Sequence, residues 1–276
     1  MKTSMNSVTI HVPATTANLG PGFDTLGLAL DLWNETEFAE TGDGKLSLTV
    51  LGEGEKTLPC DETNAIAAAA LQVYALVGKE PDGLAIRCTN RIPLISGLGS
   101  SSAALLTGML GGLVATVLSG DKIVSRKLVV SPMTITVVLP DFYFPTKAAR
   151  EILPEYVLRQ DAIFNVSRAV LVIKSLETGD LTLLGEVMED ALHQPYRLPL
   201  IPGALAAMHA ARQAGASAVA LSGAGPSLIA FSRQPANPAI GLAMKKAFEQ
   251  AGLSARIFPL NISQSGASCV ETATVR

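Results

Sequence analysis

The sequence predicts an α+β fold with two domains. The chain has 276 residues, of which 48% are hydrophobic and only 5% aromatic, so it can bury one large core or two modest ones. Strand-like and helix-like segments follow one another without an internal repeat, and those after about residue 134 form a compact α+β set of their own. We therefore place the domain boundary after residue 133, which gives domains 1–133 and 134–276.

Charge, hydropathy and cysteine content exclude several classes of function. The net charge is −3 and no basic block is present, so nucleic acid is not expected as a partner. No apolar run reaches the length of a signal peptide or a membrane span, and we expect a cytoplasmic protein with no membrane partner. Cys60, Cys88 and Cys269 are widely spaced and form no CxxC pair, which predicts buried free thiols in a reducing compartment and no metal site.

The first half of the chain is predicted to consist mainly of strands. Residues 8–14 alternate and are β-branched, which indicates a strand ended by Pro13, and residues 15–30 form a Gly/Pro-punctuated loop that enters an apolar segment. The Ala-rich stretch 61–76, with acids in its first turn, predicts a helix. Further strands are predicted at residues 34–41, 45–54, 83–93 and 111–120.

The second half is predicted to alternate helices and strands. Residues 134–140 form a continuous apolar run typical of a buried strand, and residues 155–193 form one or two helices with a boundary near 178–180. Pro202 and Gly215 mark the start and end of a further helix. The remaining segments predict strand, strand, helix and strand, at residues 216–223, 226–232, 237–252 and 254–260.

A glycine–serine loop, SGLGSSSAALL at residues 96–106, precedes an apolar helix predicted from about residue 100. Unpaired N–H groups at a helix N-terminus stabilise anions, and Gly97 and Gly99 let the backbone approach a ligand closely. The hydroxyl groups of the three serines after Gly99 can bind phosphate or Mg²⁺. Neither the P-loop pattern nor the dinucleotide fingerprint is present. Taken alone, the loop is equally typical of a phosphate site and of an ordinary serine helix cap.

Further stretches place this loop in a wider pattern. RIPLISGLGSSSAA (91–104) resembles the phosphate loop of the GHMP kinases, which phosphorylate small alcohols. VPATTANLGPGFDTLGLAL (12–30) resembles their N-terminal substrate motif, and LSGAGPSLIAF (221–231) their C-terminal glycine motif. Within that superfamily, three stretches are most similar to the homoserine kinases. They are the N-terminal substrate motif (12–30), FPTKAAREILP (144–154) and HQPYRLPLIPG (193–203).

The resemblance implies a fold and an activity. It implies a two-domain GHMP-kinase fold, with a nucleotide-binding α/β domain followed by a ferredoxin-like α+β domain and the active site in the cleft between them. It also implies transfer of the ATP γ-phosphoryl group to L-homoserine, with Mg²⁺, giving O-phospho-L-homoserine on the way to threonine. The hydroxyl is expected to attack directly, without a general base. The alternatives are another GHMP small-molecule kinase and a nucleotide-binding pseudoenzyme. Relatives are often dimers, so the resemblance also allows a second copy of this chain as a partner, in a homodimer.

Five residues are implied to bind the amino-acid substrate. By resemblance, Asn18 and Asp24 hold its amino end, Arg150 and Arg197 hold its carboxylate, and Gly223 lies in the loop beside it. Asp24 and Arg150 are also assigned as catalytic, because they would hold the hydroxyl in line. An arginine fork matches a carboxylate with two parallel hydrogen bonds. The alternative is that Asp24 is only a turn residue and that both arginines lie on solvated surfaces.

A second group of residues is implied to bind ATP, with Ser101 as the single candidate metal ligand. In the alternative interpretation Asn64 is only a polar residue of a first helical turn, and the glycines of residues 222–226 only allow a sharp turn. His193 is expected to lie at a helix C-terminus, near the negative end of the dipole. The ATP-binding residues are Asn64, Pro93, Ser96, Gly97, Leu98, Gly99, Ser100, Ser101, Ser102 and Gly225.

One segment of the family pattern has no counterpart. Homoserine kinases usually carry an EG…H.DN stretch after the phosphate-loop helix, whereas here TGML (107–110) runs directly into GGLVATVL (111–118). By resemblance that stretch supplies the glutamate that binds Mg²⁺, so its loss should weaken binding of the metal nucleotide. Two interpretations stay open: the sequence omits residues that the protein has between Leu110 and Gly111, or the deletion is genuine and leaves a weak or inactive relative.

Overall fold

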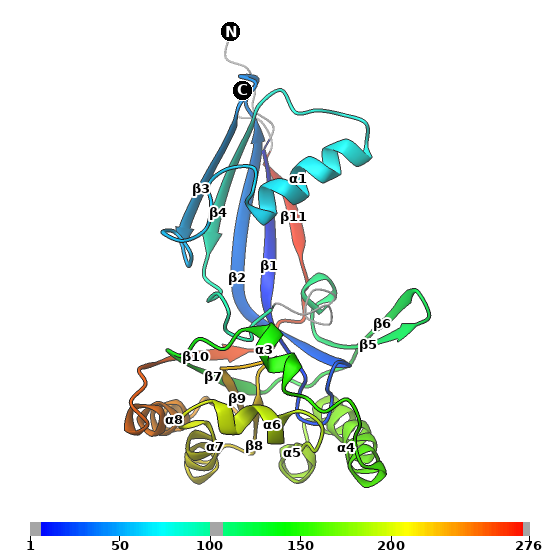
Figure 1. Ribbon diagram of the computed structural model, residues 1–276, viewed down its shortest axis with the longest axis vertical. Helices are drawn as coiled ribbons and strands as arrows, with labels where there is room; N and C mark the ends of the chain where they lie inside the picture. Colours follow the sequence, from blue (N-terminus) through cyan, green and yellow to red (C-terminus); the bar gives the residue numbers. More distant parts are fainter. Residues whose placement is uncertain (1–6, 100–106, 273–276) are drawn as a thin grey trace. The chain divides into compact units, whose positions relative to one another are not determined.

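The computed structural model of the protein describes residues 7–99 and 107–272. The chain divides into two compact units (Figure 1). The first unit comprises residues 1–13, 32–94 and 267–276, and the second comprises residues 14–31 and 95–266. The helix predicted from about residue 100 lies largely outside the described residues, and residues 107–110 are helical.

The first unit is a sheet covered by one helix. Its elements are the first part of β1 (Ser7–Ala17), the later part of β2 (Leu26–Glu40), β3 (Leu46–Gly52), β4 (Leu84–Asn90), β11 (Ser268–Thr272) and α1 (Ala65–Leu76). The strand order is β11-β1-β2-β4-β3, with β3 parallel to β4 and β4 antiparallel to β2. Helix α1 lies across one face of the sheet (Figure 1), and its buried Ala67 packs against the apolar side chains of β3 and β4.

The second unit contains the remaining strands and helices. The hairpin of β5 (Leu113–Ser119) and β6 (Lys122–Leu128) joins residues 26–28 of β2. Four strands form a separate sheet: β7 (Thr134–Pro140), β8 (Ala218–Leu221), β9 (Leu228–Ser232) and β10 (Ala255–Asn261). The helices are α3 (Thr146–Glu151), α4 (Arg159–Thr178), α5 (Leu181–Val187), α6 (Gln194–Arg197), α7 (Ala204–Gln213) and α8 (Pro238–Gln250), with a short 3₁₀ turn at Leu198–Leu200.

The four-stranded sheet has the predicted ferredoxin-like arrangement. Its spatial order is β10-β7-β9-β8 with all neighbours antiparallel, helices connect β7 to β8, and α8 connects β9 to β10. Helices α7 and α8 lie along the same side of this sheet (Figure 1). Phe248, Ile240 and Met244 of α8 are completely buried and pack with Val219 and Leu228 in the main core of this unit.

Most predicted elements are present, but the predicted end of the first strand and the predicted start of the first helix are wrong. Strand β1 continues past Pro13 to Ala17; its pairing with β11 stops at His11, so the missing N–H of Pro13 costs no bond to that neighbour. Helix α1 begins later than predicted because Asn64 is its N-cap, accepting from the N–H of Ile66. The pattern did not predict β6, α3 or β11.

The cysteines also differ from expectation. Cys88 is buried, but Cys60 and Cys269 are exposed, and all three are free. A single cysteine side chain is small, so whether it is buried depends on the segment around it more than on its own apolar character. Within the described residues no helix is both long and apolar enough to cross a membrane.

We predict that Phe248→Ala lowers the free energy of unfolding by about 3–5 kcal/mol, because it removes a fully buried ring and leaves a cavity. Leu242→Ala on the same helix is the control, since Leu242 is exposed and its loss should change stability by less than about 0.5 kcal/mol. Urea unfolding of both variants measures the difference, and equal losses would contradict the assigned core.

Candidate active site

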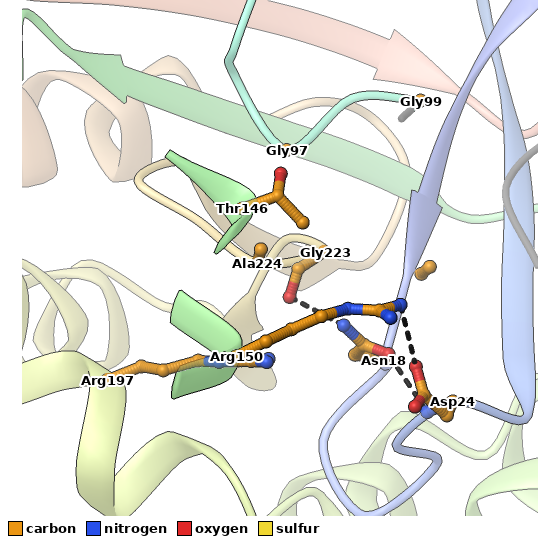
Figure 2. A pocket seen from close by; sticks show the side chains of 10 residues that line it. Asn18, Asp24, Gly97, Gly99, Thr146, Arg150, Arg197, Gly223 and Ala224 are labelled. Atoms are coloured by element: carbon orange, nitrogen blue, oxygen red, sulfur yellow. Dashed lines mark hydrogen bonds and ion pairs between the residues drawn. The ribbon is translucent and has the colours of Figure 1, made fainter. Parts of the chain in front are cut away.

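A pocket in the second unit brings together all five residues predicted to bind the amino-acid substrate. They come from the loop after β1, from α3 and α6, and from the turn between β8 and β9 (Figure 2). The pocket is lined by Ala17, Asn18, Asp24, Gly97, Gly99, Thr146, Arg150, Arg197, Gly223 and Ala224. The sequence had not singled out Ala17, Thr146 or Ala224, which carry little chemical signal of their own.

Asn18 links two loops of the pocket through its side-chain amide. Its Oδ1 accepts the backbone N–H of Asp24 at 2.9 Å, and its Nδ2 donates to the carbonyl oxygen of Gly223 at 2.8 Å (Figure 2). Asn18 is buried, with 5% of its surface exposed, and its left-handed φ of 61° is one that asparagine tolerates. Part of its hydrogen-bonding capacity therefore holds the loops, and the remainder faces the pocket.

Asp24 and Arg150 form a partly exposed pair of opposite charges at the pocket. The Arg150 Nη2 lies 3.9 Å from the Asp24 Oδ1, and 58% of each side chain is exposed. Asp24 has a left-handed φ of 52°, consistent with a turn position. Because the pair is solvated, it is weak and exchangeable. A ligand that carries one positive and one negative group can replace it with two matched contacts.

Arg197 has a very different environment from Arg150. Its residue is only 1% exposed, its Nε donates to the carbonyl oxygen of Ala149 at 2.8 Å, and its guanidinium carbon lies 5.2 Å from the centre of the Phe23 ring. Burial lowers the pKa of Arg197 to about 10, which leaves it charged at neutral pH. The alternative that both arginines lie on solvated surfaces is therefore wrong for Arg197.

The predicted phosphate loop is held by the turn after β8. Ser222 Oγ lies 3.0 Å from the carbonyl oxygen of Gly97 and 2.9 Å from Thr16 Oγ1, and the N–H of Thr15 donates to the carbonyl oxygen of Leu98. Gly97 has a φ of +80°, and a Cβ there would overlap the carbonyl oxygen of Ser222. Only glycine fits this position, so the backbone can lie close to both the turn and a ligand.

The other residues predicted to bind ATP divide into three groups. Ser96 is buried and accepts from the N–H of Leu98, and Gly225 lies against Gly97. Asn64 and Pro93 belong to the first unit, where Asn64 caps α1 and also donates to the carbonyl oxygen of Pro59. The three predicted hydroxyl ligands, Ser100, Ser101 and Ser102, lie outside the described residues.

The described residues provide no carboxylate-rich metal site. Residues 7–99 and 107–272 contain no group of three or more His, Cys, Asp and Glu side chains that are placed to hold a metal. Asp24 is the carboxylate that lines the pocket, and it already pairs with Arg150. The donor set that the structure describes therefore does not fit Mg²⁺, which prefers one or two carboxylates beside substrate phosphates.

The connection between residues 110 and 111 is tightly packed. The N–H of Gly111 donates to the carbonyl oxygen of Thr107, and the N–H of Gly112 donates to that of Ser263. Both glycines have left-handed backbones, with φ of 70° and 68°, and a Cβ on Gly111 would overlap the backbone of Ser265 and Gly266. The chain thus passes from the helical residues to β5 through a turn that needs glycine.

His193 does not lie at a helix C-terminus, as the sequence suggested, but at the N-cap of α6. Its side chain is completely buried, as is that of Asp190, whose carboxylate accepts from the backbone N–H groups of His193 and Gln194. Helix α6 has only four residues, too few for a periodic pattern, so no helix was predicted to begin after His193. An acidic residue just before a proline-containing turn is the signal that could have indicated the cap.

We predict that Gly97→Ala destabilises the protein by about 1–3 kcal/mol more than Gly42→Ala. Both glycines have left-handed φ angles, of +80° and +71°, but no atom lies within 4 Å of a Cβ placed on Gly42. The control therefore carries only the strain of the backbone, and Gly97→Ala adds a collision with the Ser222 carbonyl. Thermal and urea unfolding of both variants measure the difference, and equal losses would show that the loop relaxes freely.

We predict that stability falls when the pH is lowered from 7 to 5, in part through His193. Burial, assisted by Arg197, lowers the pKa of His193 although Asp190 opposes the shift. The unfolded state therefore takes up a proton on this imidazole near pH 6.5, where the folded state does not. The free energy of unfolding falls as the pH is lowered below that value, by at most about 1.4 kcal/mol per pH unit.

The measurement is urea unfolding at several pH values. His193→Asn should have a shallower pH dependence than the unchanged protein, and His209→Asn, at an exposed position, is the matched substitution for comparison. Parallel curves for the unchanged protein and His193→Asn would contradict the assignment.

Comparison with known proteins shows the family of the chain. Residues 172–250 match the family model described as GHMP kinases C terminal. The homoserine kinase of Moorella thermoacetica is 41% identical over 293 residues, covering 94% of this chain and 98% of that protein. The alignment spans 293 positions, whereas this chain has only 276 residues, of which 94% are aligned. The relative therefore has internal residues that this chain lacks. The segment predicted to be missing after Leu110 is one place for them.

Solved structures give the same result. The crystal structure of homoserine kinase from Cytophaga hutchinsonii is 29% identical, has a TM-score of 0.85 and covers 96% of this chain and 97% of its own. A mevalonate kinase from L. major, 14% identical with a TM-score of 0.67, covers 95% of this chain and 96% of its own and shares the fold. With the pocket, the ferredoxin-like sheet and these relatives together, the chain belongs to the homoserine kinase family of the GHMP kinases.

Proposed function

We propose that the protein transfers the γ-phosphoryl group of ATP to the hydroxyl of L-homoserine. The observation that carries the proposal is one pocket that contains a carboxylate, two guanidinium groups and a glycine loop whose backbone only glycine can adopt. The carboxylate suits an ammonium group, the guanidinium groups suit a carboxylate, and the loop suits phosphate. An amino acid with a side-chain hydroxyl presents these groups together with a nucleophile.

The proposed binding mode assigns one task to each side chain. The ammonium group of homoserine contacts Asp24 and the free capacity of the Asn18 amide, while its carboxylate contacts Arg150 and Arg197. Arg150 releases Asp24 when the substrate enters, because their 3.9 Å ion pair is solvated. Gly223 lies beside the substrate, and its carbonyl oxygen is kept in place by Asn18.

The proposed chemistry is direct attack by the substrate hydroxyl. A bond forms between the hydroxyl oxygen and the γ-phosphorus, the bond from that phosphorus to the bridging oxygen breaks, and ADP leaves. The hydroxyl proton passes to the transferred phosphoryl group, because Asp24, the carboxylate among the described lining residues, is assigned to the ammonium group of the substrate. Asp24 and Arg150 act by holding the hydroxyl in line, and the loop amides stabilise the developing charge.

We propose that ATP enters with Mg²⁺ bound to its own phosphates. Ser101, which lies outside the described residues, stays the predicted protein ligand. The phosphates would lie against Ser96, Gly97, Leu98 and Gly99, with Ser100, Ser102 and Gly225 beside them. Asn64 and Pro93 of the first unit stay predicted ATP-binding residues, on the resemblance alone.

The predicted division after residue 133 is kept as a proposal about domains. Residues 1–133 would bind ATP, and residues 134–276 contain the whole of the segment that matches the family model. A homodimer likewise stays a proposal that rests on the resemblance.

The first test measures ADP release from ATP and Mg²⁺ with protein of verified intact mass. L-Homoserine should stimulate release, whereas 4-hydroxybutanoate and 3-aminopropan-1-ol, which lack the amino group and the carboxylate respectively, should each have kcat/KM values about 10- to 100-fold lower. Galactose and mevalonate should be inert. Equal use of all these alcohols would contradict the assigned substrate, and ATP binding without any release would indicate a pseudoenzyme.

The second test uses variants of the charged pair. Asp24→Asn and Arg150→Gln should raise the KM for homoserine at least 10-fold and leave the KM for ATP within about 2-fold, because each loses one charged contact to the amino acid. Lys147→Gln is the control, since Lys147 lies on the same short helix as Arg150 but is exposed and pairs with Glu151. An effect on the KM for ATP alone would place the pair at the nucleotide.

A further inference from the structure

A group of buried ionisable side chains lies directly behind the pocket. The side chains of Asp190 and His193 are 0% exposed, and Arg197 is 1% exposed. Removing charged groups from water is costly unless each finds partners of fixed geometry. Of the three, only Arg197 lines the pocket, so the other two need a role that does not involve direct contact with the pocket.

The contacts of His193 determine which of its nitrogens carries the proton. Nε2 lies 3.0 Å from the carbonyl oxygen of Gly20, and Nδ1 lies 3.3 Å from the Nη1 of Arg197. A carbonyl oxygen only accepts hydrogen bonds and a guanidinium only donates them. His193 is therefore a neutral imidazole that donates from Nε2 and accepts the Arg197 N–H at Nδ1.

The guanidinium plane of Arg197 is held from three directions. Its Nε donates to the carbonyl oxygen of Ala149, its Nη1 donates to His193, and its carbon lies 5.2 Å from the centre of the Phe23 ring. The Phe23 ring also stacks on the imidazole, with centroids 5.0 Å apart and planes 19° from parallel. These contacts leave further N–H donors of the fork for the pocket.

Asp190 in turn holds His193. Its carboxylate accepts the N–H groups of Leu192, His193 and Gln194 at 3.0, 2.9 and 2.6 Å, and the side-chain amide of Asn165 at 2.7 Å. Four donors on one carboxylate hold the turn that starts α6, and the carboxylate also lies 3.5 Å from the His193 Nε2. Arg197 is at the other end of this four-residue helix, so its backbone and side chain are both held through Asp190.

We propose that His193 is a positioning residue that orients Arg197 toward the carboxylate of the substrate, with Asp190 holding His193 in place. The inference rests on the proposed function, since it takes an amino-acid substrate as given. A guanidinium that was free to rotate would lose its planar match to a carboxylate, and a fixed acceptor at Nδ1 prevents that rotation.

Two variants of similar size separate this role from simple packing. In His193→Asn the side-chain oxygen takes the place of Nδ1 and still accepts from Arg197. In His193→Gln the longer amide reaches Gly20 and leaves no acceptor at the Nδ1 position. We expect His193→Gln to raise the KM for homoserine 10- to 100-fold, and His193→Asn to raise it less than about 3-fold, with the KM for ATP unchanged in both.

The substrate supplies an internal control. For 3-aminopropan-1-ol, which has no carboxylate, both variants should have the same kcat/KM as the unchanged protein, because Arg197 then has nothing to orient. Equal effects of the two variants, or equal losses with both substrates, would overturn the inference. If the unchanged protein shows no homoserine-dependent ADP release, the proposed function fails instead.

A measurement on the unchanged protein keeps the inference testable if either variant does not fold. ¹⁵N NMR of the imidazoles, with His193 assigned against His11 and His209, should show an Nε2–H tautomer. The His193 Nδ1 resonance should shift when 4-hydroxybutanoate is added, and not when 3-aminopropan-1-ol is added. An Nδ1–H tautomer, or an Nδ1 resonance that 4-hydroxybutanoate leaves unmoved, would overturn it.

Discussion

The geometry of the site depends on the side-chain amide of Asn18. One amide atom accepts from the backbone of Asp24 and the other donates to the backbone of Gly223, so a single buried group joins two loops that are 205 residues apart in the sequence. Aspartate has no donor and could make only one of these bonds. The turn that contains Gly223 also holds Gly97 through Ser222. The loop after β1, the turn after β8 and the glycine–serine loop at Gly97 are therefore one hydrogen-bonded assembly, and a shift in any of them moves the others.

The two arginines of the pocket differ in how firmly they are held. Arg150 is more than half exposed and pairs weakly with Asp24, so it can exchange partners at little cost. Arg197 is buried among Ala149, His193 and Phe23, and its orientation is set before any ligand arrives. A guanidinium that is already fixed, like that of Arg197, can orient an anion at low entropic cost. A guanidinium that exchanges partners, like that of Arg150, can move aside when a ligand enters.

Much of this could be predicted from the sequence, because continuous apolar runs and glycine- or proline-marked ends identify β7 and the last four elements almost directly. The residues predicted to bind the substrate were chosen by their motifs, and the structure places them together in one pocket. The buried side chains that hold these residues in place were not predicted. Asp190 and His193 sit on a four-residue helix without periodicity, and the burial of Arg197 results from packing between segments distant in sequence. Pro13 and Cys269 were misjudged for a related reason, since strand neighbours and solvent exposure are properties of the folded chain.

The burial of Arg197 links the substrate to the lifetime of the protein. Arg197 lines the pocket and is fixed by its neighbours, so an anionic ligand bound to it would make contacts that only the folded chain offers. A ligand that binds only the folded chain adds about 2.7 kcal/mol of stability at a concentration 100 times its Kd. Proteolysis in cells follows the population of opened chains, which that stabilisation lowers by about two orders of magnitude. If the amino acid is the ligand, its supply would therefore set how long each molecule survives, with no change in the rate of synthesis.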